Sequence, residues 1–174
     1  MTEIVEMKIL ETERLYLREM ETDDAENAYR LNLDWENIKY TGDKPFESIQ
    51  EAKEFLLNYS HYKNYGFGRW AVIEKYSNEF LGWCGLKYTP ELDEYDIGFR
   101  LFKEHWNKGI ASEAAKACID YGFIKIGLTR IVGRAMNENV GSIRVLEKIG
   151  LVYMKDYNFE GESGVIYEIK KPKC

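Results

Sequence analysis

The sequence of 174 residues contains few cysteines, only two histidines and no long apolar stretch. Its three cysteines, Cys84, Cys118 and Cys174, form an odd set with neither a CxxC pair nor histidines at metal-ligand spacing. Such a set indicates neither a disulfide framework nor a metal site, and it is typical of a reducing compartment. No run reaches the ~18 apolar residues of a membrane-spanning helix. Glu3 and Glu6 stand where a secretory signal peptide would carry bases, so we expect a cytoplasmic protein without a membrane partner.

Basic charge is scarce as well. The chain carries 24 Lys and Arg against 30 Asp and Glu, which gives a net charge of −6. No basic field is therefore available to collect nucleic acid, and we expect no nucleic-acid partner. The acidity favours a cationic partner such as an amine, although many enzymes are acidic for solubility alone. With 45% hydrophobic residues, the chain suffices for one packed core, so we expect a single domain over residues 1–174.

The hydrophobic pattern predicts alternating strands and helices. Apolar residues at strand spacing predict strands over residues 12–18, 69–75, 79–88, 95–102, 129–136, 151–159 and 164–170. Helical spacing predicts helices over residues 24–33, 45–58, 109–126 and 140–149. The order contains a strand-helix-strand step around Gly109, and hairpin-length connections elsewhere. We therefore predict an α/β (α+β) fold with a mixed, mostly antiparallel sheet of about seven strands and helices on both faces.

Residues 106–113, with the sequence WNKGIASE, join a strand to a helix through a loop of small residues. Such a loop exposes successive backbone N–H groups at the positive end of a helix dipole, where a pyrophosphate binds favourably. The alternative is an ordinary turn in which Gly109 only permits a positive φ. The sequence has neither GxGxxG nor GxxxxGK[ST], so the fingerprints of other phosphate binders are missing.

A second segment covers residues 137–151 and has the sequence NENVGSIRVLEKIGL. In it, polar residues directly precede a predicted amphipathic helix. Asn139 and Ser142 have an ordinary role there as helix caps. Taken together, the two segments resemble the paired motifs of GNAT acetyltransferases, in the branch of ribosomal-protein N-terminal acetyltransferases. Residues 12–18, 70–73, 81–86 and 96–99 are similar to that branch too, so the resemblance covers nearly the whole chain.

The resemblance implies that acetyl-CoA is the co-substrate and that the sheet is splayed, with the pantetheine arm lying against the strand over residues 95–102. The implied cofactor-binding residues are Leu101, Lys103, Asn107, Lys108, Gly109, Ile110, Ala111, Ser112, Asn139 and Arg144. The family pattern Q/R-x-x-G-x-G/A keeps its glycine and alanine here but has Trp106 in the first position. Because the loop binds through backbone amides, we expect this departure to be tolerated.

Acetyl transfer from a thioester to an amine requires a base, an oxyanion donor and an acid. Many relatives supply the acid from a tyrosine where this chain has Leu146, and the resemblance points instead to Ser142. Asp96 occupies the strand position of a family glutamate and is the predicted base, acting directly or through a water. A solvated strand carboxylate at Asp96, or Glu94 with a water chain, is the alternative.

The predicted reaction is attack of a primary amine on the thioester in a ternary complex, so no cysteine nucleophile is required. Cys84 and Cys118 are expected in the core. The acceptor is expected to be a protein N-terminal amine, or a small molecule such as an antibiotic or polyamine, bound by a monomer or homodimer. The aromatic candidates for the acceptor pocket are Trp35, Tyr40, Phe46 and Tyr65. A module that binds acetyl-CoA without turnover, or a purely structural protein, is the competing interpretation.

Overall fold

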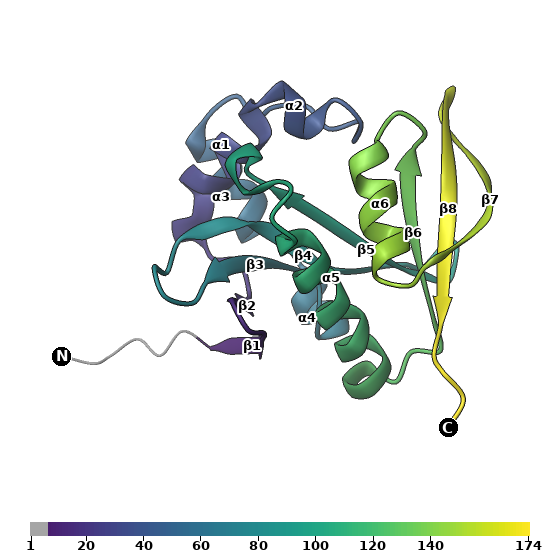
Figure 1. Ribbon diagram of the computed structural model, residues 1–174. Coiled ribbons are helices and arrows are strands. Elements are labelled where there is room, and N and C mark those ends of the chain that lie inside the picture. Colours follow the sequence, from purple (N-terminus) through teal and green to yellow (C-terminus); the bar gives the residue numbers. More distant parts are fainter. Residues whose placement is uncertain (1–6) are drawn as a thin grey trace.

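The computed structural model describes residues 7–174, so Glu3 and Glu6 lie outside the described residues. Eight strands form one sheet in the order β1-β2-β3-β4-β5-β6-β8-β7 (Figure 1). Neighbouring strands are antiparallel, except that β5 and β6 are parallel. The strands are β1 (Lys8–Glu11), β2 (Leu15–Arg18), β3 (Arg69–Glu74), β4 (Phe80–Thr89), β5 (Glu94–Leu101), β6 (Arg130–Met136), β7 (Val152–Phe159) and β8 (Glu162–Lys170).

The helices are α1 (Ala25–Leu33), α2 (Trp35–Ile38), α3 (Ile49–Leu57), α4 (His61–Tyr65), α5 (Ile110–Tyr121) and α6 (Val140–Lys148). A π-helical turn at Gly122–Ile126 continues α5. The four helices expected from the periodicity are confirmed. The short elements β1, α2 and α4 were not expected, because four or five residues are too few to display either period.

Alternation along the strands sends successive side chains to opposite faces of the sheet. On one face, Trp70 of β3 lies in the main core with Cys118 of α5 and Leu146 of α6. On the other face, Ile73 belongs to a smaller cluster that Met20 joins to the core between α1 and α3. Helices therefore cover both faces, as expected.

The sheet opens between its two parallel strands. β5 and β6 are paired through a single register position, Asp96 with Val132, although β5 continues to Leu101 and β6 to Met136. Beyond that pair the strands diverge toward their carboxyl ends, which leaves the backbone edge of β5 without a neighbouring strand. This divergence is the splay that the resemblance implied. Within residues 7–174, no helix is both long enough and apolar enough to cross a membrane.

Candidate functional site

The loop before α5 has the backbone geometry of a phosphate cradle. Asn107 and Gly109 both have left-handed backbones, with φ values of 59° and 75°. The first bond of the helix runs from the Glu113 N–H to the Gly109 carbonyl oxygen at 3.0 Å. The amides of residues 110–112 therefore have no helical acceptor and remain free to bind an anion at the positive end of the dipole.

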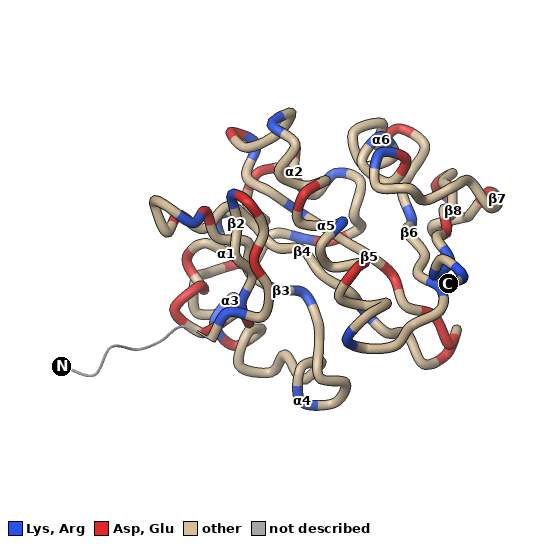
Figure 2. The backbone as a smooth tube through the Cα atoms, turned by 60° about the horizontal axis from the view of Figure 1, so that its bottom comes forward, with Lys and Arg blue, Asp and Glu red and all other residues tan. Residues whose placement is uncertain are grey.

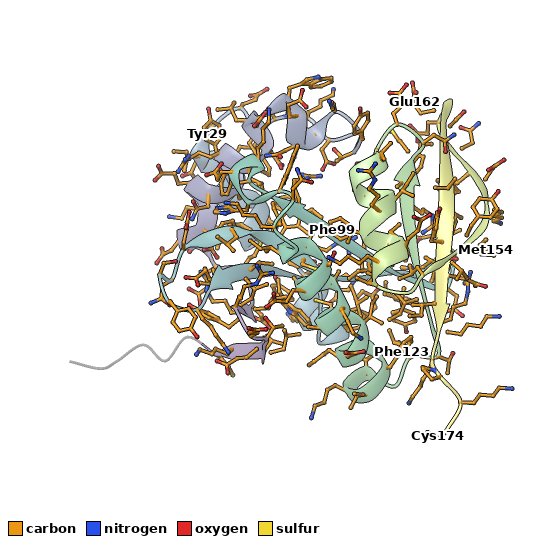
Figure 3. All side chains as sticks on the ribbon, in the orientation of Figure 1. Tyr29, Phe99, Phe123, Met154, Glu162 and Cys174 are labelled. Carbon is orange, nitrogen blue, oxygen red and sulfur yellow. The ribbon has the colours of Figure 1, made fainter. Side chains whose placement is uncertain are left out.

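A cavity of about 550 Å³ opens at this loop. Its walls come from the end of β5, the loop before α5, the start of α6 and the segment around α2 (Figure 1). Phe99 of β5, labelled in Figure 3, is one of the lining residues. The cavity lies where β5 and β6 have diverged, so the splay of the sheet and the phosphate cradle belong to one site.

The charges of the cavity differ from those of the whole chain. Figure 2 shows acidic and basic residues interspersed along the chain. The lining residues include four cationic side chains and two acidic ones, namely Lys39, Arg100, Arg144, Lys148, Glu36 and Glu138. A cavity with more cations than anions, in a protein of net charge −6, favours an anionic ligand.

Most of the cofactor-binding residues implied by the resemblance lie in this cavity. Those that line it are Leu101, Asn107, Gly109, Ile110, Ala111, Ser112, Asn139 and Arg144. Lys103 begins a 3₁₀ turn (Lys103–His105) and Lys108 lies in the loop, and neither is among the lining residues. The Trp106 indole N–H donates to the Leu101 carbonyl oxygen at 3.0 Å, so this departure from the family pattern ties the loop to the end of β5.

The comparison with known families decides the identity of the fold. A model of the acetyltransferase (GNAT) domain matches residues 14–152. The chain belongs to the GNAT acetyltransferase family. It is an acetyl-CoA-dependent N-acetyltransferase.

Individual relatives of this acetyltransferase agree with the assignment. N-acetyltransferase p20 of Bacillus licheniformis is 36% identical over 145 residues, which cover 82% of each chain. A GNAT-family acetyltransferase from Bacillus anthracis is 30% identical with a TM-score of 0.80, covering 92% of this chain and 97% of that one. Spermidine N-acetyltransferase from Vibrio cholerae, solved with CoA and spermine, shares the fold at 22% identity and a TM-score of 0.76, covering 91% and 96%.

Ser142, the predicted acid, lines the cavity at the start of α6. The capping group of α6 is the Asn139 side chain, whose Oδ1 accepts from the Ser142 backbone N–H at 3.3 Å. The Ser142 hydroxyl is therefore not the cap. Leu146, where relatives carry tyrosine, is 2% exposed and packs in the main core.

Asp96, the predicted base, is not among the lining residues, and its carboxylate is held by Arg69. Asp96 Oδ1 lies 2.7 Å from Arg69 Nη2, and both side chains are about one-fifth exposed. Gly98 makes room for this pair, because a Cβ there would lie 2.7 Å from the Arg69 Cζ. The competing carboxylate, Glu94, is bound by Arg130 at 3.2 Å and by Arg134.

The cysteines lie away from the cavity. Cys84 and Cys118 are fully buried, with their sulfur atoms 3.8 Å apart between β4 and α5. Burial, together with the hydrogen bond to Cys84, raises the pKa of the Cys118 thiol well above its ordinary value. Because the thiolate is the nucleophilic form, a buried thiol of high pKa is unsuited to acyl transfer.

Of the four aromatic candidates for the acceptor pocket, Tyr40 lines the cavity. Trp35 is 66% exposed, Phe46 packs beside the core of α1 and α3, and Tyr65 belongs to an aromatic group with His61. Sequence reasoning missed Lys148 and the two α2 residues that line the cavity, Glu36 and Asn37. Arg144 and Lys148 stand four residues apart on α6, and this spacing on one helical face is a signal from which the second cation could have been predicted.

Proposed function

We propose that this N-acetyltransferase transfers the acetyl group directly to a primary amine in a ternary complex, and that the acceptor is a peptide or protein N-terminus. One observation carries the proposal: a single cavity is lined both by the phosphate-cradle loop and by α2. Both substrates can therefore occupy one space at once, without an acyl-enzyme intermediate. The buried cysteines support this route, since neither thiol meets the cavity.

The cofactor end of the cavity comprises the loop before α5 and the start of α6. The amides of residues 107–112 are proposed to bind the pyrophosphate, with Arg144 and Lys148 adding charge-assisted contacts to phosphate oxygens. The unpaired edge of β5 at Leu101 is proposed to receive the pantetheine amides. The Leu101 carbonyl accepts from Trp106 already, and its second lone pair remains available.

Catalysis is proposed to use Ser142 as the acid that protonates the departing thiolate. Asp96 is proposed to remove the amine proton through an intervening water. A water is needed because the Asp96 carboxylate is bound by Arg69 and does not line the cavity. Asp96→Asn keeps the shape of the side chain and removes its charge. It should lower kcat more than it raises KM for acetyl-CoA; an unchanged kcat, with chemistry rate-limiting, would exclude Asp96 as the base.

The charges that line the cavity favour an acceptor with one ammonium group over a polyamine. Glu36 is paired with Lys39 at 2.8 Å, and Arg100, which also lines the cavity, is paired with Asp43 at 2.7 Å. Among the cavity-lining residues, Glu138 is the acid that makes no ion pair within residues 7–174. One unpaired carboxylate suits one ammonium group, whereas a polyamine needs several.

The test is acceptor profiling with labelled acetyl-CoA, using peptides with free N-termini, the same peptides with blocked N-termini, spermidine and an aminoglycoside. Transfer to free N-termini and not to blocked ones supports the proposal. A higher kcat/KM for spermidine, the acceptor in the name of the Vibrio cholerae neighbour, would replace the peptide by a polyamine. Binding of acetyl-CoA with no thiol release on any amine would indicate a module without turnover.

A further inference from the structure

Arg14, immediately before β2, connects the start of that strand to the phosphate-cradle loop, the loop before α5. Its Nη1 donates to the Lys108 carbonyl oxygen at 2.9 Å. Its Nε donates to Glu113 Oε2 at 2.7 Å, and its backbone N–H donates to Glu113 Oε1 at 2.9 Å. The Thr12 hydroxyl also donates to Glu113 Oε1, at 2.6 Å. Arg14 therefore hydrogen-bonds both to the loop and to the first turn of α5.

The bond to Lys108 fixes the orientation of a peptide group. In a trans peptide the C=O and the following N–H point in opposite directions, and the described residues contain no cis peptide. With the Lys108 carbonyl turned toward Arg14, the Gly109 N–H must point away from Arg14. Gly109 lines the cavity and Arg14 does not, so the N–H is directed to the cavity side of the loop.

The loop cannot secure this orientation by itself. Rotating the peptide between Lys108 and Gly109 changes mainly the ψ of the first residue and the φ of the second. Glycine adopts either sign of φ with similar ease, so rotation of this peptide costs little free energy at Gly109. A contact from outside the loop is needed to hold the N–H toward a phosphate.

We propose that Arg14 is a positioning residue that locks this peptide and thereby aims the Gly109 N–H at the pyrophosphate of acetyl-CoA. The inference rests on the proposed cofactor end of the cavity. It assigns Arg14 no contact with the cofactor. The role requires an arginine, because the planar guanidinium binds a carboxylate and a carbonyl at once, whereas a lysine ammonium is a single point on a flexible chain.

The Glu113 carboxylate supplies the second anchor of this lock. Burial of Glu113 would raise its pKa, but the hydrogen bonds from Thr12 and from Arg14 outweigh it, and the pKa is lowered. The carboxylate is therefore ionised at neutral pH. Its three donors fix the base of the arginine side chain, so the guanidinium meets the loop in one orientation.

The experiment compares wild type, Arg14→Lys and Arg14→Ala for binding of acetyl-CoA and for kcat/KM with acetyl-pantetheine, which lacks the pyrophosphate. Both variants should bind acetyl-CoA about 10-fold or more weakly, the effect of one lost hydrogen bond to a charged group. Their kcat/KM with acetyl-pantetheine should stay within twofold of wild type. The ¹⁵N-labelled amide of Gly109 should shift in both variants before any ligand is added.

Arg130→Ala is the matched control, since Arg130 is also held by two acids, Glu94 at 3.2 Å and Glu168 at 2.7 Å, outside the cavity. The Arg130→Ala variant should have a lower melting temperature. Its affinity for acetyl-CoA relative to its kcat/KM with acetyl-pantetheine should be the same as in wild type. Wild-type affinity in Arg14→Lys with weak binding in Arg14→Ala would overturn the lock, because charge alone would then suffice. Equal losses with both thioesters would also overturn it. Failure of wild type to bind acetyl-CoA would instead overturn the proposed cofactor site itself.

Discussion

Replacement of Gly109 by alanine tests the phosphate cradle directly. Gly109 has a φ of 75°, and a Cβ there would lie 3.4 Å from Arg14 Nη2. An L-residue in the left-handed region costs about 1–2 kcal/mol, which the loop can relieve only by rotating its peptides. Rotation turns an N–H away from the phosphates. Losing one hydrogen bond to a charged group costs about 1.5–3 kcal/mol, or about 10- to 150-fold in Kd.

Gly127 provides the matched control for the backbone strain. It has a φ of 80°, a Cβ there would meet no atom within 4 Å, and it follows the π-helical turn after α5. Gly127→Ala should therefore destabilise the fold about as much as Gly109→Ala while leaving the cavity intact. The expected loss of melting temperature is about 2–4 °C for each kcal/mol in a domain of this size.

The assay combines the melting temperature of each variant without ligand with calorimetric titration of acetyl-CoA. Gly109→Ala should lose both stability and affinity, whereas Gly127→Ala should lose stability alone. If Gly109→Ala melts as early as Gly127→Ala but binds acetyl-CoA like wild type, the loop does not hold the phosphates. If both variants lose affinity equally, the loss reports strain of the fold and the cradle assignment fails.

Three further predictions concern side chains. Ser142→Ala should lower kcat about 10²–10⁴-fold with unchanged affinity for acetyl-CoA and little change in melting temperature, because the Asn139 side chain caps α6; a wild-type kcat in single-turnover experiments rules out the acid role. Cys84→Ala and Cys118→Ala should keep their turnover per folded molecule, and mass spectrometry that traps an acetylated cysteine in wild type would contradict this. Burial raises the pKa of Glu113 and its hydrogen bonds lower it more, so the folded carboxyl titrates below the ordinary value of 4.5. The unfolded chain then binds more protons, so the free energy of unfolding of wild type falls as the pH drops below about 4.5. In urea titrations at several pH values, the free energy of unfolding of Glu113→Gln should fall less steeply with decreasing pH. Equal slopes for the two proteins would show that the contacts of Glu113 do not favour its ionised form.

Sequence reasoning predicted those helices and strands that are long enough to show a local periodicity. The helix beginning at Ile110 and the strand ending at Leu101 were found because each repeats its period several times. The same reasoning missed α2, which has four residues, yet α2 supplies one wall of the cavity. The loop before α5 was predicted as a phosphate cradle because small residues before a helix expose backbone N–H groups wherever the helix is placed, and its left-handed Asn107 and Gly109 are compatible with that prediction.

What the sequence alone determined is therefore the family and the reaction class, and it also predicts the phosphate cradle, since all three are read from contiguous motifs. What the tertiary structure decided is which distant side chains meet those motifs. Arg69 lies 27 residues from Asp96 and holds its carboxylate, and Arg14 lies 94 residues from Lys108 and holds its carbonyl. No periodicity encodes such pairs, because they form only when folding brings together segments that are far apart in the chain. The environment of each catalytic candidate consequently depends on packing, while its presence depends on the sequence.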